Sequence, residues 1–421
     1  MIATVPLIIR RSILLSTAML GTVLADSQPI NCALPHTDNR LSQCAVVHYA
    51  SEYPSCLSAT DITQHTCIVM DSDLSFCENT ESLPLTTVFD RSDKTLDCRG
   101  GTIDHGWGRV ELPNGPVTTE ATRIPAVRFM DDRSLTGITI QNCTIRGTNH
   151  IGIQATRFFG GELGGDGVLS EGEPLPVGHG DLVLRNLTIE DTGLGIYLGT
   201  YSHNVSIDNV VVDRSERIAI YSEAGTHNLS ITNSVITNNQ TREAIAIDST
   251  YDSVIENNLF VNNREGGINL YQNCGELKGI VCPVVRSTPS NNNVVQNNAF
   301  VNTGISGVQV ASRQGRNHSL GWCATLNGLP GQFTDTSRNN TVSNNVFICQ
   351  EGTALLVKDG PNTVENNRIV ARDQCVPFEI STGGLGSSAS ERLNGIKMKG
   401  NQIDATLPPK LRNLGSDVVV D

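Results

Sequence analysis

Short apolar runs with a period of two recur along the chain. Residues 244–247 read AIAI and residues 267–270 read GINL, and related runs begin at residues 151, 195, 217, 307 and 354. A second run rich in β-branched residues follows, and its markers Ile207, Ile231 and Ile255 are each 24 residues apart. Because a period of two is typical of strands and not of helices, the pattern predicts an all-β protein.

A repeat of 22–25 residues built from such strands predicts a solenoid, a parallel β-helix in which each coil buries its apolar residues against its neighbours. One Asn recurs per coil, where left-handed backbone is expected and where the amides are expected to form a ladder in an internal turn. These residues are Asn209, Asn233, Asn257, Asn297, Asn344 and Asn366.

The start of the chain has the features of a signal peptide. Arg10 and Arg11 precede an apolar stretch, and small residues precede Asp26, so residues 1–25 are predicted to direct export to the periplasm or outside the cell. An uncleaved membrane anchor is the alternative, and no later segment is long enough to span a membrane. All twelve cysteines follow residue 25, which predicts disulfides, with Cys274 and Cys282 as one plausible pair.

The repeat divides the remaining chain into three parts. Residues 26–96 do not repeat and are predicted to form a Cys-rich N-terminal cap, residues 97–404 the β-helix, and residues 405–421 a C-terminal tail or cap. The formal net charge is −13, and removal of residues 1–25 makes it −15. This acidic balance excludes bulk electrostatic binding of nucleic acid, and a polyanionic substrate would need local Arg, Lys or a bridging cation. The chain is expected to be a monomer.

These coils resemble the right-handed parallel β-helix of the pectate-lyase-like superfamily, and LDCRGGTIDHG at residues 96–106 is similar to its opening coil. The rhythm is most similar to the alginate epimerase and lyase branch, although the Asp-Pro-His motif of mannuronan epimerases is absent. The resemblance implies a right-handed helix. It also implies one of four functions: polysaccharide lyase, polyuronate epimerase, glycoside hydrolase or adhesin.

Alternation along each strand predicts which side chains face solvent. In the AIAI run the isoleucines face the core, so Ala246 and Asp248 face outward. The same register gives the outward pairs Tyr197 and Gly199, Ala219 and Tyr221, Asn269 and Tyr271, Gln309 and Ala311, and Leu356 and Lys358. Tyr221, Asp248 and Tyr271 are therefore expected on successive coils about 5 Å apart. The following turns carry Tyr201, Glu223, Asn273 and Arg313.

Insertions at residues 157–180, 272–291, 313–338 and 381–393 follow the same strand of their coils, which predicts that they wall a groove along this strip. A lyase or epimerase acting on a uronate must neutralise a carboxylate, remove the neighbouring proton and protonate the product. The candidates for neutralising the carboxylate are Arg313, Arg264 or a Ca²⁺ ion held by Asp248 and Glu223. The candidates for the base or the acid are Tyr221 and Tyr271.

The predicted catalytic residues are Tyr221, Asp248, Tyr271 and Arg313. The predicted residues for binding a polysaccharide are Tyr197, Tyr201, Glu223, Asn269, Arg264, Gln309 and Lys358. No other cofactor is indicated.

Other interpretations remain open. Glu223 and Asp248, roughly 8 Å apart on a diagonal, suit an inverting hydrolase. A row of tyrosines also suits a non-catalytic polysaccharide-binding or adhesin-like surface protein, or serves only to stack between coils. His203 and His227 are interpreted first as turn residues that bond the backbone. The Arg-Glu pairs at residues 242–243 and 264–265 are interpreted as solvated ion pairs.

Overall fold

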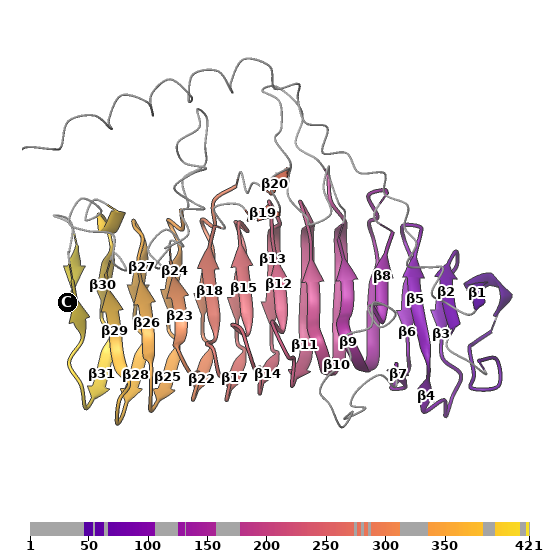
Figure 1. The fold of residues 1–421 in the computed structure, drawn as a ribbon, viewed down its shortest axis with the longest axis horizontal. Coiled ribbons are helices and arrows are strands. Elements are labelled where there is room, and N and C mark those ends of the chain that lie inside the picture. Colours follow the sequence, from indigo (N-terminus) through magenta and orange to yellow (C-terminus); the bar gives the residue numbers. More distant parts are fainter. Residues whose placement is uncertain are drawn as a thin grey trace, which may run out of the picture.

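The computed structural model describes residues 46–53, 55–62, 66–105, 125–130, 132–156, 177–272, 276–278, 282–284, 288–311, 336–381, 392–412 and 418–420. In this part of the chain 31 strands form one continuous sheet, and β19 (Glu276–Lys278) and β20 (Cys282–Val284) form a separate antiparallel pair. Every pairing within the large sheet for which a register is known is parallel, and the coils stack side by side along one axis (Figure 1). The prediction of an all-β parallel β-helix is confirmed.

Three faces wind along this axis, and the long strands β9 (Thr139–Ala155), β10 (Gly180–Leu198) and β11 (His203–Asp213) turn the corners between them. Face 1 joins the end of β9 and β10 to β1 (Val46–Tyr49), β2 (Thr66–Met70), β5 (Leu85–Phe89), β8 (Val127–Phe129), β12 (Ile220–Ser222), β15 (Ile245–Asp248), β18 (Ile268–Tyr271), β23 (Ser306–Val310), β26 (Thr353–Val357), β29 (Val376–Ile380) and β32 (Lys410–Leu411).

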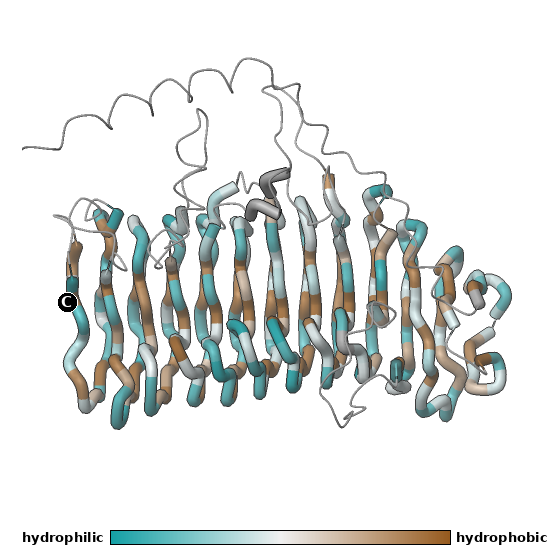
Figure 2. Tube along the Cα trace, viewed as in Figure 1, coloured by the Kyte–Doolittle hydropathy of each residue, from teal (hydrophilic) through white to brown (hydrophobic). Residues whose placement is uncertain are grey.

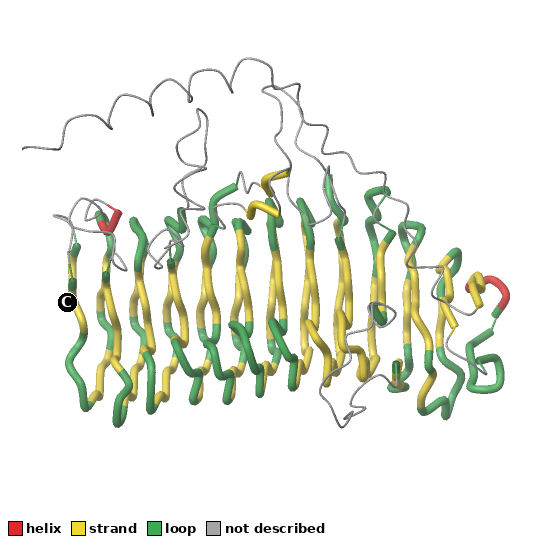
Figure 3. The backbone as a smooth tube through the Cα atoms, viewed as in Figure 1, coloured by secondary structure: helices red, strands yellow, loops and turns green. Residues whose placement is uncertain are grey.

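Face 2 contains β3 (Leu74–Ser75), β6 (Thr95–Asp97), β13 (His227–Thr232), β16 (Val254–Glu256), β21 (Val294–Gln296), β24 (Thr341–Ser343), β27 (Thr363–Glu365), β30 (Lys397–Lys399) and β33 (Val419–Val420). Face 3 contains β4 (Ser82–Leu83), β7 (Thr102–Asp104), β14 (Val235–Thr237), β17 (Leu259–Val261), β22 (Ala299–Val301), β25 (Val346–Cys349), β28 (Arg368–Ala371) and β31 (Gln402–Ala405). A 3-10 turn, η2 (Ala50–Glu52), lies near the start, and Figure 3 shows how strands and loops alternate in every coil.

The parallel stack extends beyond both boundaries expected from the repeat. Strands β1 to β6 already pair in parallel with the next coil, so the β-helix begins well before residue 97. At the other end Val419 pairs with Lys397, beyond residue 404. Main-chain pairing needs only an extended strand with an inward apolar residue. Ile68 and Leu83 are such buried residues, although the sequence around them lacks the repeated pattern of the later coils.

Three disulfides join coils within the described residues: Cys56–Cys77, Cys98–Cys143 and Cys349–Cys375. They confirm the prediction that cysteines are paired, and they are consistent with an oxidising compartment. Cys274 lies outside the described residues, as does the predicted signal peptide. Within the described part of the chain, no helix has both the length and the apolar character needed to cross a membrane.

The interior is built from columns of identical side chains. Apolar and polar segments alternate along each coil (Figure 2), and the rings of Phe260, Phe300 and Phe347 stack with centroids 4.6 and 4.8 Å apart. The predicted Asn positions do adopt left-handed backbone, with φ between 50° and 57°. Asn209 donates to Asn186, at the equivalent position of the previous coil, at 2.9 Å. The buried ladder, however, is made by the residue that follows Asn257, Asn297, Asn344 and Asn366, because the left-handed residue points outward and its successor turns inward.

This ladder is a column of amides at Asn258, Asn298, Asn345, Asn367 and Asn401. The Nδ2 of each of the first four donates to the Oδ1 of the next amide at 2.9–3.0 Å, and all five also donate to a backbone carbonyl. The bonds satisfy turn groups that would otherwise be buried without partners.

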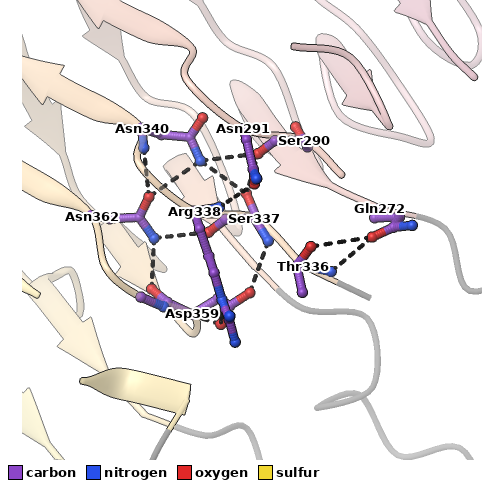
Figure 4. Close-up of polar contacts among 10 residues, drawn as sticks. Gln272, Ser290, Asn291, Thr336, Ser337, Arg338, Asn340, Asp359 and Asn362 are labelled. Carbon is purple, nitrogen blue, oxygen red and sulfur yellow. Dashed lines mark hydrogen bonds and ion pairs between the residues drawn. The ribbon is translucent and has the colours of Figure 1, made fainter. Parts of the chain in front are cut away.

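A second amide column runs beside the point where β24 begins (Figure 4). Asn340 donates to Asn362 at 3.2 Å, and Asn362 donates to the carbonyl of Asp359 at 2.7 Å. The carboxyl of Asp359 is fully buried and accepts from the N–H of Ser337 at 2.8 Å. Burial raises the pKa of this carboxyl, although the Ser337 N–H and the nearby arginines oppose that shift. The network fixes where the chain enters this coil.

Candidate functional site

The outward row on face 1 has the expected register where Asp248 pairs with Tyr271 and Asn269 with Gln309, but a different one in the coils before Ala246. Tyr197 pairs with Tyr221, Tyr221 with Ala246, and Ala246 with Asn269. Tyr221 was expected opposite Asp248. The shift arises because the N–H groups of Ala219 and Ile220 both bond the carbonyl of Ala244, so two residues of one coil meet one residue of the next.

The row faces away from the main core, but it is not exposed. Asp248 is 0% exposed, Glu223 1% and Tyr271 4%. A second apolar cluster, separate from the core, contains Ile151, Leu194, Ile218, Ala246 and Tyr271, with Tyr197 and Tyr221 packed against it. The prediction of a solvent-facing strip is therefore wrong for most of its members, because strand alternation shows only which side a residue takes. Tyr197 and Tyr221 are half-buried.

Two carboxylates share the hydroxyl of Tyr221. The Tyr221 Oη lies 2.9 Å from Glu223 Oε2 and 3.0 Å from Asp248 Oδ2. Tyr197 Oη donates to the other oxygen of Glu223, and the Tyr197 and Tyr221 rings stack with centroids 5.2 Å apart. A phenol has one hydrogen, so two short contacts to carboxyl oxygens mean that one proton serves three oxygens. This is a geometry for moving a proton.

A second group adjoins the first through Arg242. Tyr271 Oη donates to Glu243 Oε1 at 3.1 Å, and Arg242 Nε donates to Glu243 Oε2 at 3.2 Å. Burial lowers the pKa of Arg242, but the charges on Glu243, Tyr271 and Tyr221 outweigh this and raise it above its usual range. The guanidinium is thus held by Glu243, the same carboxylate that accepts from Tyr271, while 39% of the Arg242 side chain stays exposed.

Arg242 and Glu243 were not among the predicted site residues. The interpretation as a solvated ion pair is wrong for them, since the Glu243 side chain is only 7% exposed, but it holds for Arg264 and Glu265, where Arg264 is 76% exposed. The available signal was position: Arg242 and Glu243 come directly before the AIAI run that leads to Asp248.

The remaining predicted residues are dispersed. Asn269 pairs with Gln309 further along the row, and both side chains are buried. Lys358 is half-buried, and its backbone N–H donates to the carbonyl of Val310. Tyr201 is buried in a turn, and its ring lies against Gly225. A side chain at residue 225 would put its Cβ 2.4 Å from that ring, so the contact requires glycine. Arg264 lies exposed in the turn before β18.

Several predicted residues of the insertions lie outside the described residues. These are Arg313, Asn273 and most of the segments expected to wall a groove.

The histidines near the site bond the backbone, as expected. His227 Nδ1 lies 3.0 Å from the carbonyl of Gly225, and His203 Nδ1 lies 3.3 Å from that of Tyr201. Their rings stack on each other, and the His227 ring also stacks on Tyr251.

The described residues contain no group of three or more His, Cys, Asp or Glu suited to a metal ion. Glu223 and Asp248 do not fit the suggested Ca²⁺ ion, because the Tyr221 hydroxyl occupies the space between them and Ca²⁺ takes six to eight oxygen ligands.

Residues 126–282 match the family model for the right-handed β-helix region, and this span contains the whole network from Tyr197 to Tyr271. The chain is thus a right-handed parallel β-helix. A search of curated protein sequences found no match.

Several solved structures are similar to this chain at low identity. The A-module of the mannuronan C-5 epimerase AlgE4 from Azotobacter vinelandii is 12% identical with a TM-score of 0.43, covering 89% of this chain and 88% of that one. The periplasmic alginate epimerase AlgG is 10% identical with a TM-score of 0.45, covering 89% and 83%. The catalytic domain of a GH87 α-1,3-glucanase is 13% identical with a TM-score of 0.44, covering 85% of this chain and 60% of that one.

Proposed function

We propose that this protein is a carbohydrate-active enzyme that removes the proton beside a uronate carboxylate in an acidic polysaccharide, as a lyase or an epimerase does. The observation that carries the proposal is the hydroxyl of Tyr221 shared between Glu223 and Asp248. Such a hydroxyl accepts a proton from carbon if its own proton passes to a carboxylate at the same moment. General base catalysis requires this kind of contact at hydrogen-bonding distance.

The reaction divides the roles among residues that the fold brings together. Tyr221 Oη takes the proton from the carbon next to the substrate carboxylate, and its own proton moves to Glu223 or Asp248. In a lyase the electron pair forms a carbon–carbon double bond and expels the glycosidic oxygen, which takes a proton from Tyr271. In an epimerase the proton from Tyr271 returns to the opposite face of the same carbon. Glu243 accepts a hydrogen bond from Tyr271 and so orients its hydroxyl.

Arg242 is the residue for neutralising the substrate carboxylate. Its guanidinium is part-exposed and lies near Tyr221 and Tyr271. Arg264, by contrast, is exposed and paired only loosely with Glu265. A cation is needed there because the carboxylate must accept charge as the proton leaves. Arg313 remains a further candidate.

The alternative of an inverting hydrolase loses support from the same distances. The two oxygens bonded by Tyr221 can be no farther apart than the sum of the two contacts, about 5.9 Å. Inverting hydrolases separate their carboxyls by about 6.5–9.5 Å to admit a water molecule. Here a phenol fills that space. A non-catalytic role remains the second candidate, since the stacked Tyr197 and Tyr221 rings present an aromatic edge to which sugar could bind.

The test is a panel of polymannuronate, polyguluronate, polygalacturonate and a neutral glucan, incubated with purified protein and read in three ways. New ultraviolet absorbance with new reducing ends is the result expected for a lyase. Exchange of solvent deuterium into the uronate without either signal is expected for an epimerase. Reducing ends without absorbance would overturn the proposal in favour of hydrolysis. Saturable binding with no chemistry in any assay would overturn it in favour of a binding protein.

A further inference from the structure

The charge along one edge of face 1 reverses between the two ends of the solenoid. This edge, which we call the turn edge, consists of the residues that follow each strand of face 1 and precede face 2. On the four successive coils of β23, β26, β29 and β32, each turn carries one cation: Arg338, Lys358, Arg392 and Arg412. We call these four residues the cationic row. The described residues of these turns include one acid, Asp359, which is fully buried.

The early coils carry the opposite excess at the same edge. In the turns after β2, β5 and β8, the described residues comprise five acids and three cations: Asp71, Asp73, Asp90, Asp93 and Asp132, with Arg91, Lys94 and Arg133. Two of these cations have acidic neighbours. Arg91 Nε lies 3.9 Å from Asp90 Oδ2, and Arg133 Nη2 lies 2.7 Å from Asp132 Oδ2. The turn edge is therefore anionic in the early coils and cationic in the late ones.

The cationic row is accessible to a ligand. Arg412 is exposed, and Lys358 and Arg392 are half-buried. Arg338 lies beside Asp359 with its Nε 3.5 Å from Oδ1, yet 39% of the Arg338 side chain stays exposed (Figure 4). Because Asp359 itself is fully buried, a ligand at this edge meets guanidinium and ammonium groups and not the carboxyl.

The spacing of the cationic row suits a linear polyanion. Neighbouring coils lie about 4.8 Å apart, so the four cations extend over about 14 Å. A uronate polymer carries one carboxylate on each sugar ring, and a ring is comparable in length with the rise of one coil. A single exposed ion pair contributes little, but linked charges that meet several cations at once add their contributions.

We propose that the acidic polysaccharide lies lengthwise on face 1 and extends from Tyr221 over the late coils, where its carboxylates meet the cationic row. The coil of Arg338 is three coils from that of Tyr221, about 14 Å, and the coil of Arg412 is six coils away, about 29 Å. The acids of the early coils repel a polyanion on the other side. The inference rests on the proposed function for the class of ligand, and it adds the direction in which the polymer extends.

The test is calorimetric titration of the purified full chain with trimers and octamers of mannuronate, guluronate and galacturonate. The chain carries Tyr221→Phe so that the oligomers are not consumed. A trimer placed at Tyr221 does not reach the cationic row, whereas an octamer does. We therefore expect at least one octamer to bind about tenfold more tightly than its trimer.

The double variant Lys358→Ala/Arg412→Ala is expected to weaken binding of that octamer about fivefold and to leave binding of the trimer unchanged. High salt should produce the same loss without the variant. The matched control is Lys397→Ala/Lys399→Ala, which removes two exposed cations from β30 on face 2 at the same end of the solenoid. This control should bind the octamer as tightly as the parent.

Equal losses in the two double variants would overturn the proposal, because the attraction would then come from the charge of the whole end of the solenoid. Octamers that bind no more tightly than trimers, or that do not bind, would overturn it as well. If the alanine variant melts early, Lys358→Gln/Arg412→Gln removes the charges while keeping long polar side chains.

The two proposals fail separately. Wild-type chemistry on a polymer whose octamer binds independently of Lys358 and Arg412 would keep the proposed function and overturn the direction of the polymer. Octamer binding that depends on these two residues, with no chemistry in the wild type, would support the direction and overturn the proposed function.

Discussion

The buried asparagine column and the tyrosine row lie on neighbouring coils and overlap at Ala246 and Asn269, yet they are built on opposite rules. Asn258, Asn298 and Asn345 repeat one residue type with the same bonds at each step. The row on face 1 does not keep one residue type: two stacked tyrosines, Tyr197 and Tyr221, are followed by Ala246 and Asn269. A side chain repeated in every coil stabilises the stack. A side chain that breaks the repeat, and is still buried and hydrogen-bonded, is the place to look for chemistry.

The most damaging change to the repeated part should be Phe300→Ala. Phe300 is 1% exposed and stacks between Phe260 and Phe347, so truncation leaves a cavity that its neighbours cannot fill. We expect a loss of about 3–5 kcal/mol in the free energy of unfolding. Urea unfolding followed by circular dichroism measures it. Val254→Ala, an outward truncation, should cost less than about 1 kcal/mol. Equal losses would show that the column is not special.

Asn298→Ala should cost somewhat less, about 2–3 kcal/mol, because it leaves a turn carbonyl and an amide N–H buried without partners. The neighbouring Asn297 is exposed with φ of 56°, so Asn297→Gly should cost only a few tenths of a kcal/mol. Thermal unfolding of both variants compares adjacent residues of one turn. If Asn297→Gly were the more damaging change, the assignment of the ladder to the second Asn would be wrong.

Arg242→Ala and Arg264→Ala compare the same residue type before successive strands. Removing Arg242 leaves the buried Glu243 without its cation, and we expect a loss of about 1 kcal/mol with a stronger loss of binding to polyuronate. Arg264→Ala should leave both stability and binding unchanged, since that side chain is solvated. Calorimetric titration with oligouronates and thermal unfolding separate the two effects. Equal binding by both variants would remove Arg242 from the site.

The smallest effect expected depends on pH. Hydrogen bonds from Asn233 and Thr232 hold the pKa of Asp208 below its usual value. A carboxyl with a lowered pKa stabilises the fold above the unfolded pKa of about 3.9, and this contribution disappears as the pH falls through the folded pKa. Asp208→Asn should thus lower the melting temperature at neutral pH and converge with the wild type in acid. A difference that stays constant with pH would rule out this linkage.

The fold could be predicted from the sequence because it depends on the period, which the inward isoleucines and the turn asparagines display openly. The register of one coil could not be predicted from the sequence. Ile218 has the place in its run that Ile245 has in the next run, but it is Ile220 that pairs with Ile245 in the structure. Burial of Asp248 and Tyr271 could not be predicted either, because alternation is a property of one strand and burial depends on what packs over it. Glu243 was overlooked because ion pairs beside turns are usually solvated.

The most direct test of the proposed chemistry compares Tyr221→Phe with Tyr251→Phe on the substrate that the wild type converts. Both remove one hydroxyl from a half-buried ring that stacks on an aromatic neighbour, but only Tyr221 bridges Glu223 and Asp248. We predict that Tyr221→Phe lowers kcat by a factor of about 10²–10⁴ with melting nearly unchanged, and that Tyr251→Phe keeps full activity. Full activity in Tyr221→Phe would contradict the account.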